Sequence, residues 1–123
     1  MTRILAVDDE PHILRLVSFS LTARGFEVLE ATDGLAAIET AEREHPDLIL
    51  MDVMMPVLDG YEACRRIKAN PETTDIPIVM LSAKSQKAEQ AVGLEAGALD
   101  YITKPFTPKD LVEQVRGFLG ETP

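Results

Sequence analysis

Hydrophobic and polar positions recur along the chain with two different periods, and together they predict five strands and five helices. Short apolar or alternating runs predict strands at residues 4–7, 27–31, 48–52, 76–81 and 100–103. Apolar residues three or four positions apart predict helices at residues 11–24, 34–45, 60–69, 84–96 and 108–118. The run at 48–52 has four consecutive apolar residues before Asp52, which is typical of a strand buried on both faces.

Local signals mark where several of these elements begin and end. Pro11 suits the first turn of a helix, and Arg24 followed by Gly25 predicts the end of that helix. Thr107 before Pro108 is the pattern of a helix N-cap.

The helix at 84–96 has the weakest pattern of the five. Its inward residues are mostly alanine, Gly93 interrupts it, and the large residues in its stripe are Val92 and Leu94. We therefore expect this helix to be the one most easily displaced.

Strands and helices that alternate with short connections favour a parallel sheet covered by helices on both faces. The expected fold class is therefore a three-layer α/β/α domain with a five-stranded parallel sheet. The common doubly wound order for five strands is 2-1-3-4-5, which places strands one and three side by side.

Composition and charge argue against several classes of function for this domain. The 123 residues carry a net charge of −9, which argues against nucleic-acid binding by this domain. No apolar run approaches the roughly 20 residues of a membrane span. The single cysteine, Cys64, fits a reducing cytoplasm and a place in the core.

Four predicted strands end on side chains that could take part in chemistry. Asp8 and Asp9 follow the first strand, Asp52 ends the third, Ser82 follows the fourth and Lys104 follows the fifth. The carboxyl ends of parallel strands meet at one edge of a sheet, where α/β proteins bind ligands. Plainer roles are open to each residue: helix caps for Asp8, Asp9 and Ser82, and a solvated charge for Lys104. The presence of such groups at four strand ends together favours a shared site.

Three acids in one pocket need compensating charge. Two carboxylates about 4 Å apart repel by roughly 4 kcal/mol at an effective dielectric constant near 20. Lys104 offsets one negative charge, and a divalent cation matches the remainder. A site with few oxygen ligands from the protein suits Mg²⁺ better than Ca²⁺. Zinc is disfavoured because no histidine or cysteine lies among these residues. Such a site would receive a phosphoryl group on a carboxylate oxygen.

The motifs that surround these residues resemble receiver domains of two-component response regulators, such as those of the chemotaxis and phosphate-regulon types. They are Val7-Asp8-Asp9-Glu10, the run from Asp47 to Pro56, Asp59-Gly60, Leu81-Ser82-Ala83-Lys84, and the run from Gly97 to Phe106. They span nearly the whole chain. The resemblance implies a flavodoxin-like receiver fold, with residues 1–120 as a single domain and 121–123 as a C-terminal tail.

The resemblance also implies roles. Asp52 would accept phosphate from a sensor histidine kinase or a phosphotransfer protein, catalysing its own phosphorylation and slow dephosphorylation. Mg²⁺ would be bound by Asp9, Asp52 and the Met54 carbonyl, with Asp8 acting mostly through water.

Further roles carried over from the family concern phosphate contacts and signalling. Lys104 would contact the phosphate, and its bond to Pro105 would be cis. Ser82 and Tyr101 would form the switch, while Met54 and Lys84 would control phosphate lifetime. The expected output is a change of the face formed by the fourth helix, fifth strand and fifth helix. Charge-paired dimers form there in many DNA-binding relatives. That charge pattern is largely missing here, so we expect a domain that stays mostly monomeric.

Two alternatives share parts of the pattern. A flavodoxin-like cofactor binder would need a phosphate loop after the first strand, where this chain places Asp8-Asp9-Glu10. An aspartyl-phosphate phosphohydrolase would carry a second aspartate two residues after the nucleophile, where this chain has Met54. Whether the chain stands alone or belongs to a longer regulator with an output domain is open, as are its kinase and its pathway.

Overall fold

The computed structural model describes residues 1–83 and 87–120, which form five strands and five helices in strict alternation. The strands are β1 (Arg3–Val7), β2 (Glu27–Ala31), β3 (Leu48–Asp52), β4 (Ile78–Ala83) and β5 (Asp100–Lys104). The helices are α1 (Pro11–Thr22), α2 (Gly34–Glu44), α3 (Gly60–Ala69), α4 (Lys87–Glu95) and α5 (Pro108–Phe118).

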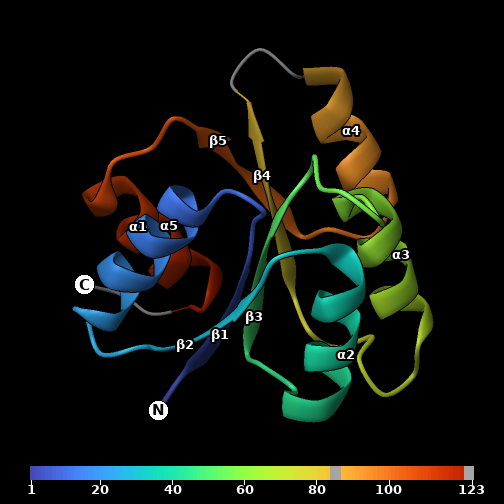
Figure 1. Cartoon of the computed structure of the whole chain (residues 1–123), viewed down its shortest axis with the longest axis horizontal. Coiled ribbons are helices and arrows are strands. Elements are labelled where there is room, and N and C mark those ends of the chain that lie inside the picture. The colour runs from blue at the N-terminus through green and yellow to red at the C-terminus, as the bar shows by residue number, and fades with distance from the viewer. Residues whose placement is uncertain (84–86, 121–123) are drawn as a thin grey trace.

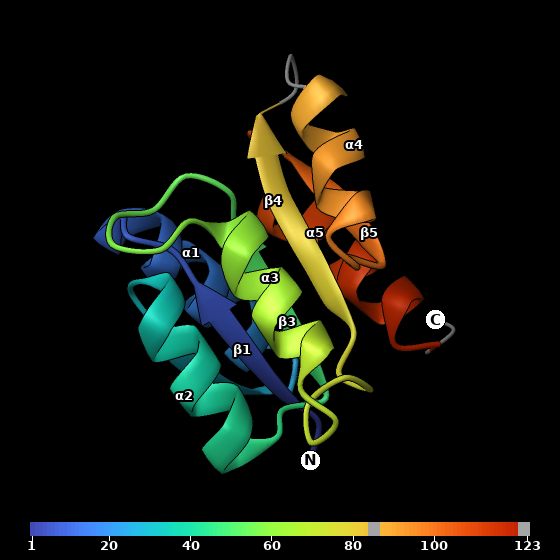
Figure 2. The ribbon, with the colours of Figure 1, turned by 90° about the vertical axis from the view of Figure 1, so that its right-hand side faces the viewer.

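The strands form one parallel sheet in the order β2-β1-β3-β4-β5, as predicted. Helices α1 and α5 cover one face, and α2, α3 and α4 cover the other (Figures 1 and 2). The predicted three-layer α/β/α fold is confirmed. Because all strands are parallel, their carboxyl ends lie along one edge, at the top of Figure 1.

Each face of the sheet has its own core. Ile4, Leu50 and Ile102 pack with the buried residues of α1 and α5, and Leu5, Met51 and Met80 pack with those of α2 and α3. Successive residues of a strand point to opposite faces, so this division tells which face each strand residue occupies.

The predicted helix caps are largely confirmed. Pro11 occupies the first turn of α1, and the Thr107 hydroxyl accepts a hydrogen bond from the Asp110 backbone N–H. Helix α1 ends at Thr22, two residues before the predicted Arg24, and Gly25 follows in a turn with φ +92°.

Strand β4 starts and ends two residues later than predicted, so Ser82 lies within the strand and does not follow it. Proline lacks the N–H of a sheet ladder, and Pro77 contributes only its carbonyl, which accepts from the Ile49 N–H at 3.0 Å. Ile76 is buried in the preceding turn, which explains its apolar character without a strand. At the other boundary, Lys104 is the last residue of β5.

The predicted inward stripe of α4 is wrong for its large residues. Val92 and Leu94 are 36% and 45% exposed, whereas Gln90 and Gly93 face the sheet. Within residues 90–95, the residues shown to face β4 are a polar amide and a glycine, so apolar spacing gave the wrong side of the helix. Residues 84–86 of the predicted helix lie outside the described part of the chain.

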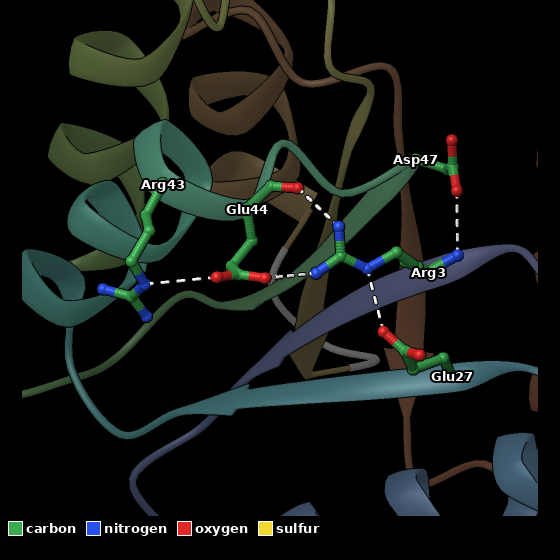
Figure 3. Close-up of polar contacts among 5 residues, drawn as sticks. All are labelled: Arg3, Glu27, Arg43, Glu44 and Asp47. Carbon is green, nitrogen blue, oxygen red and sulfur yellow. Dashed lines mark hydrogen bonds and ion pairs between the residues drawn. The ribbon is translucent and has the colours of Figure 1, made fainter.

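At the amino-terminal edge of the sheet, Arg3 of β1 contacts β2, the end of α2 and the residue before β3 (Figure 3). Its Nε lies 2.9 Å from a Glu27 carboxylate oxygen, its guanidinium contacts the carbonyl and the carboxylate of Glu44, and its backbone N–H donates to Asp47. This cluster lies at the opposite edge from the strand ends that carry the candidate site.

Cys64 is fully buried on α3, and burial raises the pKa of its thiol to about 11. The prediction of a core position is confirmed. No helix within residues 1–83 or 87–120 has the length and apolar character needed to cross a membrane.

Candidate functional site

The acids and the lysine of the predicted site come together at the carboxyl edge of the sheet. Lys104 Nζ lies 2.9 Å from Asp52 Oδ1 and 3.2 Å from Asp8 Oδ2, so one ammonium group bridges two carboxylates. Lys104 is 96 residues from Asp8 and 52 from Asp52 along the chain. The strand order brings them together, because β1 and β3 are central neighbours.

Strand alternation explains why the side chains of Asp52 and Lys104 meet. Asp52 follows Met51, which faces the α2–α3 core, so Asp52 turns toward the α1–α5 face. Lys104 is two residues after Ile102, which belongs to the α1–α5 core, and therefore points the same way. The hydrogen bonds that join Lys104 to Asp52 and Asp8 agree with this placement.

The plainer interpretations of these residues are wrong. Helix α1 has Glu10 at its N-cap with no side-chain cap, and Asp8 Oδ1 instead accepts from the Glu10 backbone N–H at 3.0 Å. The Lys104 side chain is 22% exposed and hydrogen-bonded to both acids, which differs from a freely solvated charge.

Burial is the main electrostatic feature of Asp52. Burial raises the pKa of Asp52 to about 6, the hydrogen bond from Lys104 opposes that rise, and the charges of Asp8 and Asp9 add to it. Burial lowers the pKa of Lys104, but its hydrogen bonds and attraction to Asp52 and Asp8 outweigh burial and raise it. The pocket therefore holds a firmly protonated lysine and still lacks positive charge.

The donor set fits a hard cation. Asp8, Asp9 and Asp52 each offer a carboxylate oxygen, and these oxygens lie within 4.8 Å of one another. Asp8 and Asp52 are buried while Asp9 is exposed, so the cluster opens to solvent on one side. An all-oxygen set of few protein ligands with solvent access suits Mg²⁺, which keeps several waters.

The loop between β3 and α3 is held against Asp52 by a glycine. A side-chain carbon at Gly60 would lie 2.1 Å from the Asp52 carbonyl oxygen, which is impossible for any other residue without displacement. The Gly60 N–H donates to the Val53 carbonyl at 3.0 Å, closing the loop that carries Met54.

Met54, in this loop, is 69% exposed. The roles assigned to Met54, as a carbonyl ligand and in phosphate lifetime, stay predictions. Lys84, its predicted partner in controlling lifetime, lies outside the described residues.

The predicted switch residues lie on the other face of the sheet. Ser82 is two residues after Met80 and Tyr101 pairs with Met80, so both point toward the side covered by α4. Ser82 is 2% exposed, and Tyr101 is half-buried against the α2–α3 core. The predicted cis bond between Lys104 and Pro105 is present.

Gln90 is a residue of this region that the sequence pattern did not reveal. Its Nε2 donates to Ser82 Oγ at 3.2 Å, and the residue is 8% exposed. One glutamine in a helix rich in polar residues carries no pattern signal. Its spacing three residues before Gly93 would identify it only if the sheet-facing side of α4 were already known.

Comparison with known proteins agrees with this geometry. The family model described as response regulator receiver domain matches residues 4–116. The alkaline phosphatase synthesis transcriptional regulatory protein PhoP of Bacillus subtilis is 44% identical over 117 residues, covering 95% of this chain and 48% of that protein. The transcriptional regulator RpaA of Synechocystis, named as DNA-binding, is 41% identical over 122 residues, covering 99% of this chain and 51% of that protein. The chain thus spans about half the length of these curated relatives.

Solved structures show the same fold. The chemotaxis response regulator CheY4 of Vibrio cholerae superposes with a TM-score of 0.90 at 33% identity, covering 95% of this chain and 98% of that one. The receiver domain of the sensor histidine kinase PA1611 from Pseudomonas aeruginosa superposes with a TM-score of 0.89 at 36% identity, covering 98% of both chains. That structure has a magnesium ion coordinated in its active site cleft.

Proposed function

The chain belongs to the response regulator receiver domain family of two-component signalling, and from that premise we propose that Asp52 is its phosphoryl acceptor. The observation that carries the proposal is the Lys104 ammonium bridging the buried Asp52 and Asp8 carboxylates at the edge where β1 and β3 end. The donor would be a phosphohistidine of a sensor kinase or a phosphotransfer protein.

In the transfer, a carboxylate oxygen of Asp52 forms a bond to phosphorus. The bond between phosphorus and the donor histidine nitrogen breaks, and its electron pair stays on that nitrogen. Lys104 would contact a phosphoryl oxygen once the group is attached, and the Ser82 hydroxyl would donate a hydrogen bond to another. Transfer and slow hydrolysis would both be promoted by these residues of the domain itself.

Mg²⁺ would be held by Asp9, Asp52 and the Met54 carbonyl, with Asp8 acting mostly through water. When bound, the ion supplies positive charge against the phosphoryl oxygens. The first support is the cluster of carboxylate oxygens within 4.8 Å of one another. The second is the burial of Asp52, which disfavours its charged form and so favours a nearby cation.

The output proposal concerns the face formed by α4, β5 and α5. PhoP and RpaA are named transcriptional regulators, and this chain spans about half of each. We propose that residues 1–120 form the receiver domain, with 121–123 as a tail, and that this face controls an output domain or a partner. The net charge of −9 supports the proposal that this domain does not itself contact nucleic acid. Its action in the cytoplasm remains a prediction.

The two alternatives have less support. A flavin phosphate would be repelled by Asp8 and Asp9 after β1, and the general acid of an aspartyl phosphohydrolase is replaced by Met54. We expect the purified protein to show no flavin absorbance, which would argue against the flavodoxin-like alternative.

Intact-protein mass spectrometry with acetyl phosphate tests the proposal. We expect the mass of one phosphoryl group to be added with Mg²⁺ and not with a chelator. Asp52→Asn should abolish labelling, and Asp9→Ala should slow it at least roughly tenfold through weaker metal binding.

Asp75→Asn is the matched control, because Asp75 is exposed, lies before β4 and contacts His45. It should label as the wild type does. Full labelling of the Asp52→Asn protein would overturn the assignment.

A further inference from the structure

The amide of Gln90 is a buried polar group that donates a hydrogen bond to the hydroxyl of Ser82. The distance from Gln90 Nε2 to Ser82 Oγ is 3.2 Å, and the two residues are 8% and 2% exposed. A buried polar group that loses its partner without replacement is destabilised by its full desolvation. The contact therefore favours any arrangement of Ser82 and α4 that preserves it.

The hydrogen bond holds Ser82 on the face opposite Asp52. Ser82 shares the α4 side of the sheet with Met80, whereas Asp52 and Lys104 point toward the α1–α5 side. To donate to a phosphoryl group on Asp52, the Ser82 hydroxyl has to turn from α4 toward the edge of the sheet. That turn stretches or breaks its hydrogen bond with Gln90.

Among the α4 side chains that the structure describes, from Gln90 onward, few pack on β4. Three residues after Gln90, Gly93 lies so close to β4 that an added side-chain carbon would be 3.1 Å from Met80 Cγ. The large apolar residues Val92 and Leu94 are exposed and contribute little to this interface. The hydrogen bond from Gln90 is consequently the polar contact that joins this part of α4 to Ser82.

We propose that Gln90 is a positioning residue that latches the Ser82 hydroxyl to α4 in the unphosphorylated domain and thereby opposes phosphoryl binding at Asp52. The proposal rests on the function proposed above. Release of the latch frees the hydroxyl for the phosphoryl group and leaves the Gln90 amide to find a new partner, which displaces α4. The same hydrogen bond thus sets the threshold for activation and carries the signal to the helix.

Titration with beryllofluoride, a phosphoryl mimic, in the presence of Mg²⁺ tests the latch by calorimetry. Gln90→Met keeps the length of the side chain and removes the amide, so we expect beryllofluoride to bind about 3- to 10-fold more tightly. Gln90→Ala should shift the affinity in the same direction and serves if the methionine variant folds poorly. Glu95→Gln, an exposed position on the same helix, is the control and should bind as the wild type does.

A double-mutant cycle with Ser82→Ala isolates the contact. Without the hydroxyl there is nothing to latch, so Gln90→Met should change the affinity little in the Ser82→Ala background. Without beryllofluoride and Mg²⁺, amide hydrogen exchange in α4 should be faster in Gln90→Met than in wild type.

Damage to the site would weaken beryllofluoride binding, whereas loss of the latch strengthens it. Unchanged or weaker binding by both Gln90 variants would overturn the proposal while wild-type binding still supported Asp52 as acceptor. If the wild type does not bind beryllofluoride, the function proposed for Asp52 fails, and the latch fails with it.

Discussion

Val57 has a backbone conformation that its side chain disfavours. Its φ is +69°, in the left-handed region where a β-branched residue is an outlier, and it lies 76% exposed in the loop after β3. A left-handed φ costs about 1–2 kcal/mol for a residue with a side chain, and glycine removes that cost. Glycine also loses more conformational entropy on folding, which cancels part of the stabilisation. Val57→Gly should therefore raise the free energy of unfolding by roughly 0.5–1 kcal/mol.

Urea denaturation of the two proteins measures this difference. Val57→Ala keeps a side-chain carbon and should recover less stability than the glycine variant. A glycine variant less stable than wild type would show that the loop does not hold Val57 under strain.

Met54 offers a prediction about the lifetime of the phosphorylated state. It is exposed beside Asp52, and an apolar side chain cannot orient a water molecule for attack on phosphorus. We expect replacement by Asn together with Lys84→Glu to speed dephosphorylation roughly tenfold or more, as an oriented water allows. A dephosphorylation time course measures this, with Met54→Leu as the apolar control. Equal or slower loss in the double variant would contradict the prediction.

At the scale of elements, the buried strands were the most predictable parts. The apolar run before Asp52 gave both ends of β3 correctly. A strand buried on both faces is apolar at nearly every position, so its limits are clear in the sequence. Strand β4 was misplaced by two residues, since Ile76 is apolar for burial in a turn and not for a place in the ladder.

The candidate site followed the same logic. The carboxyl ends of parallel strands lie at one edge of the sheet, so Asp8, Asp52 and Lys104 could be predicted to converge once the common strand order 2-1-3-4-5 was assumed. Gln90 could not be predicted, because its role depends on which side of α4 faces β4, and the apolar residues of α4 point elsewhere.

Arg3 connects elements in a way that predicts a measurable effect on stability. It links β1 to β2 through Glu27 and to the end of α2 through Glu44. Arg3→Met keeps most of the stem and removes the guanidinium, so it should lower the free energy of unfolding. The loss should be smaller than the roughly 2–5 kcal/mol of a core truncation such as Ile49→Ala, because both partners are partly exposed.

The effect of Arg3 should also depend on pH. The hydrogen bond from Arg3 holds the pKa of the Glu44 carboxyl below its ordinary value of 4.5. A lowered carboxyl pKa stabilises the fold above that value, and the stabilisation is lost as the pH falls through the folded-state pKa. Denaturation curves of wild type and Arg3→Met should thus converge below pH 4.5 and separate above it. A difference in stability between the two proteins that stays constant from below to above pH 4.5 would show that Arg3 does not lower the pKa of Glu44.

For the whole molecule, the described surface suggests how the α4–β5–α5 face is used. Between Gln90 and Thr103 the sequence has two acids, Glu95 and Asp100, and no lysine or arginine. Gln90 is buried against Ser82, while Val92, Leu94 and Leu99 are exposed. A dimer held by alternating charges across this face would lack cations on α4 and β5 over that stretch, and each copy carries a net charge of −9.

We therefore expect the domain to remain mostly monomeric when activated and to present this face to a different partner. Sedimentation velocity at micromolar concentration with Mg²⁺ and beryllofluoride is the measurement, and the same protein without beryllofluoride is the control. The two samples should sediment alike as monomers, because activation would not place a lysine or arginine between Gln90 and Thr103. A tight dimer that forms with beryllofluoride and is lost on Leu99→Glu would place a self-association surface here, and the prediction would be wrong.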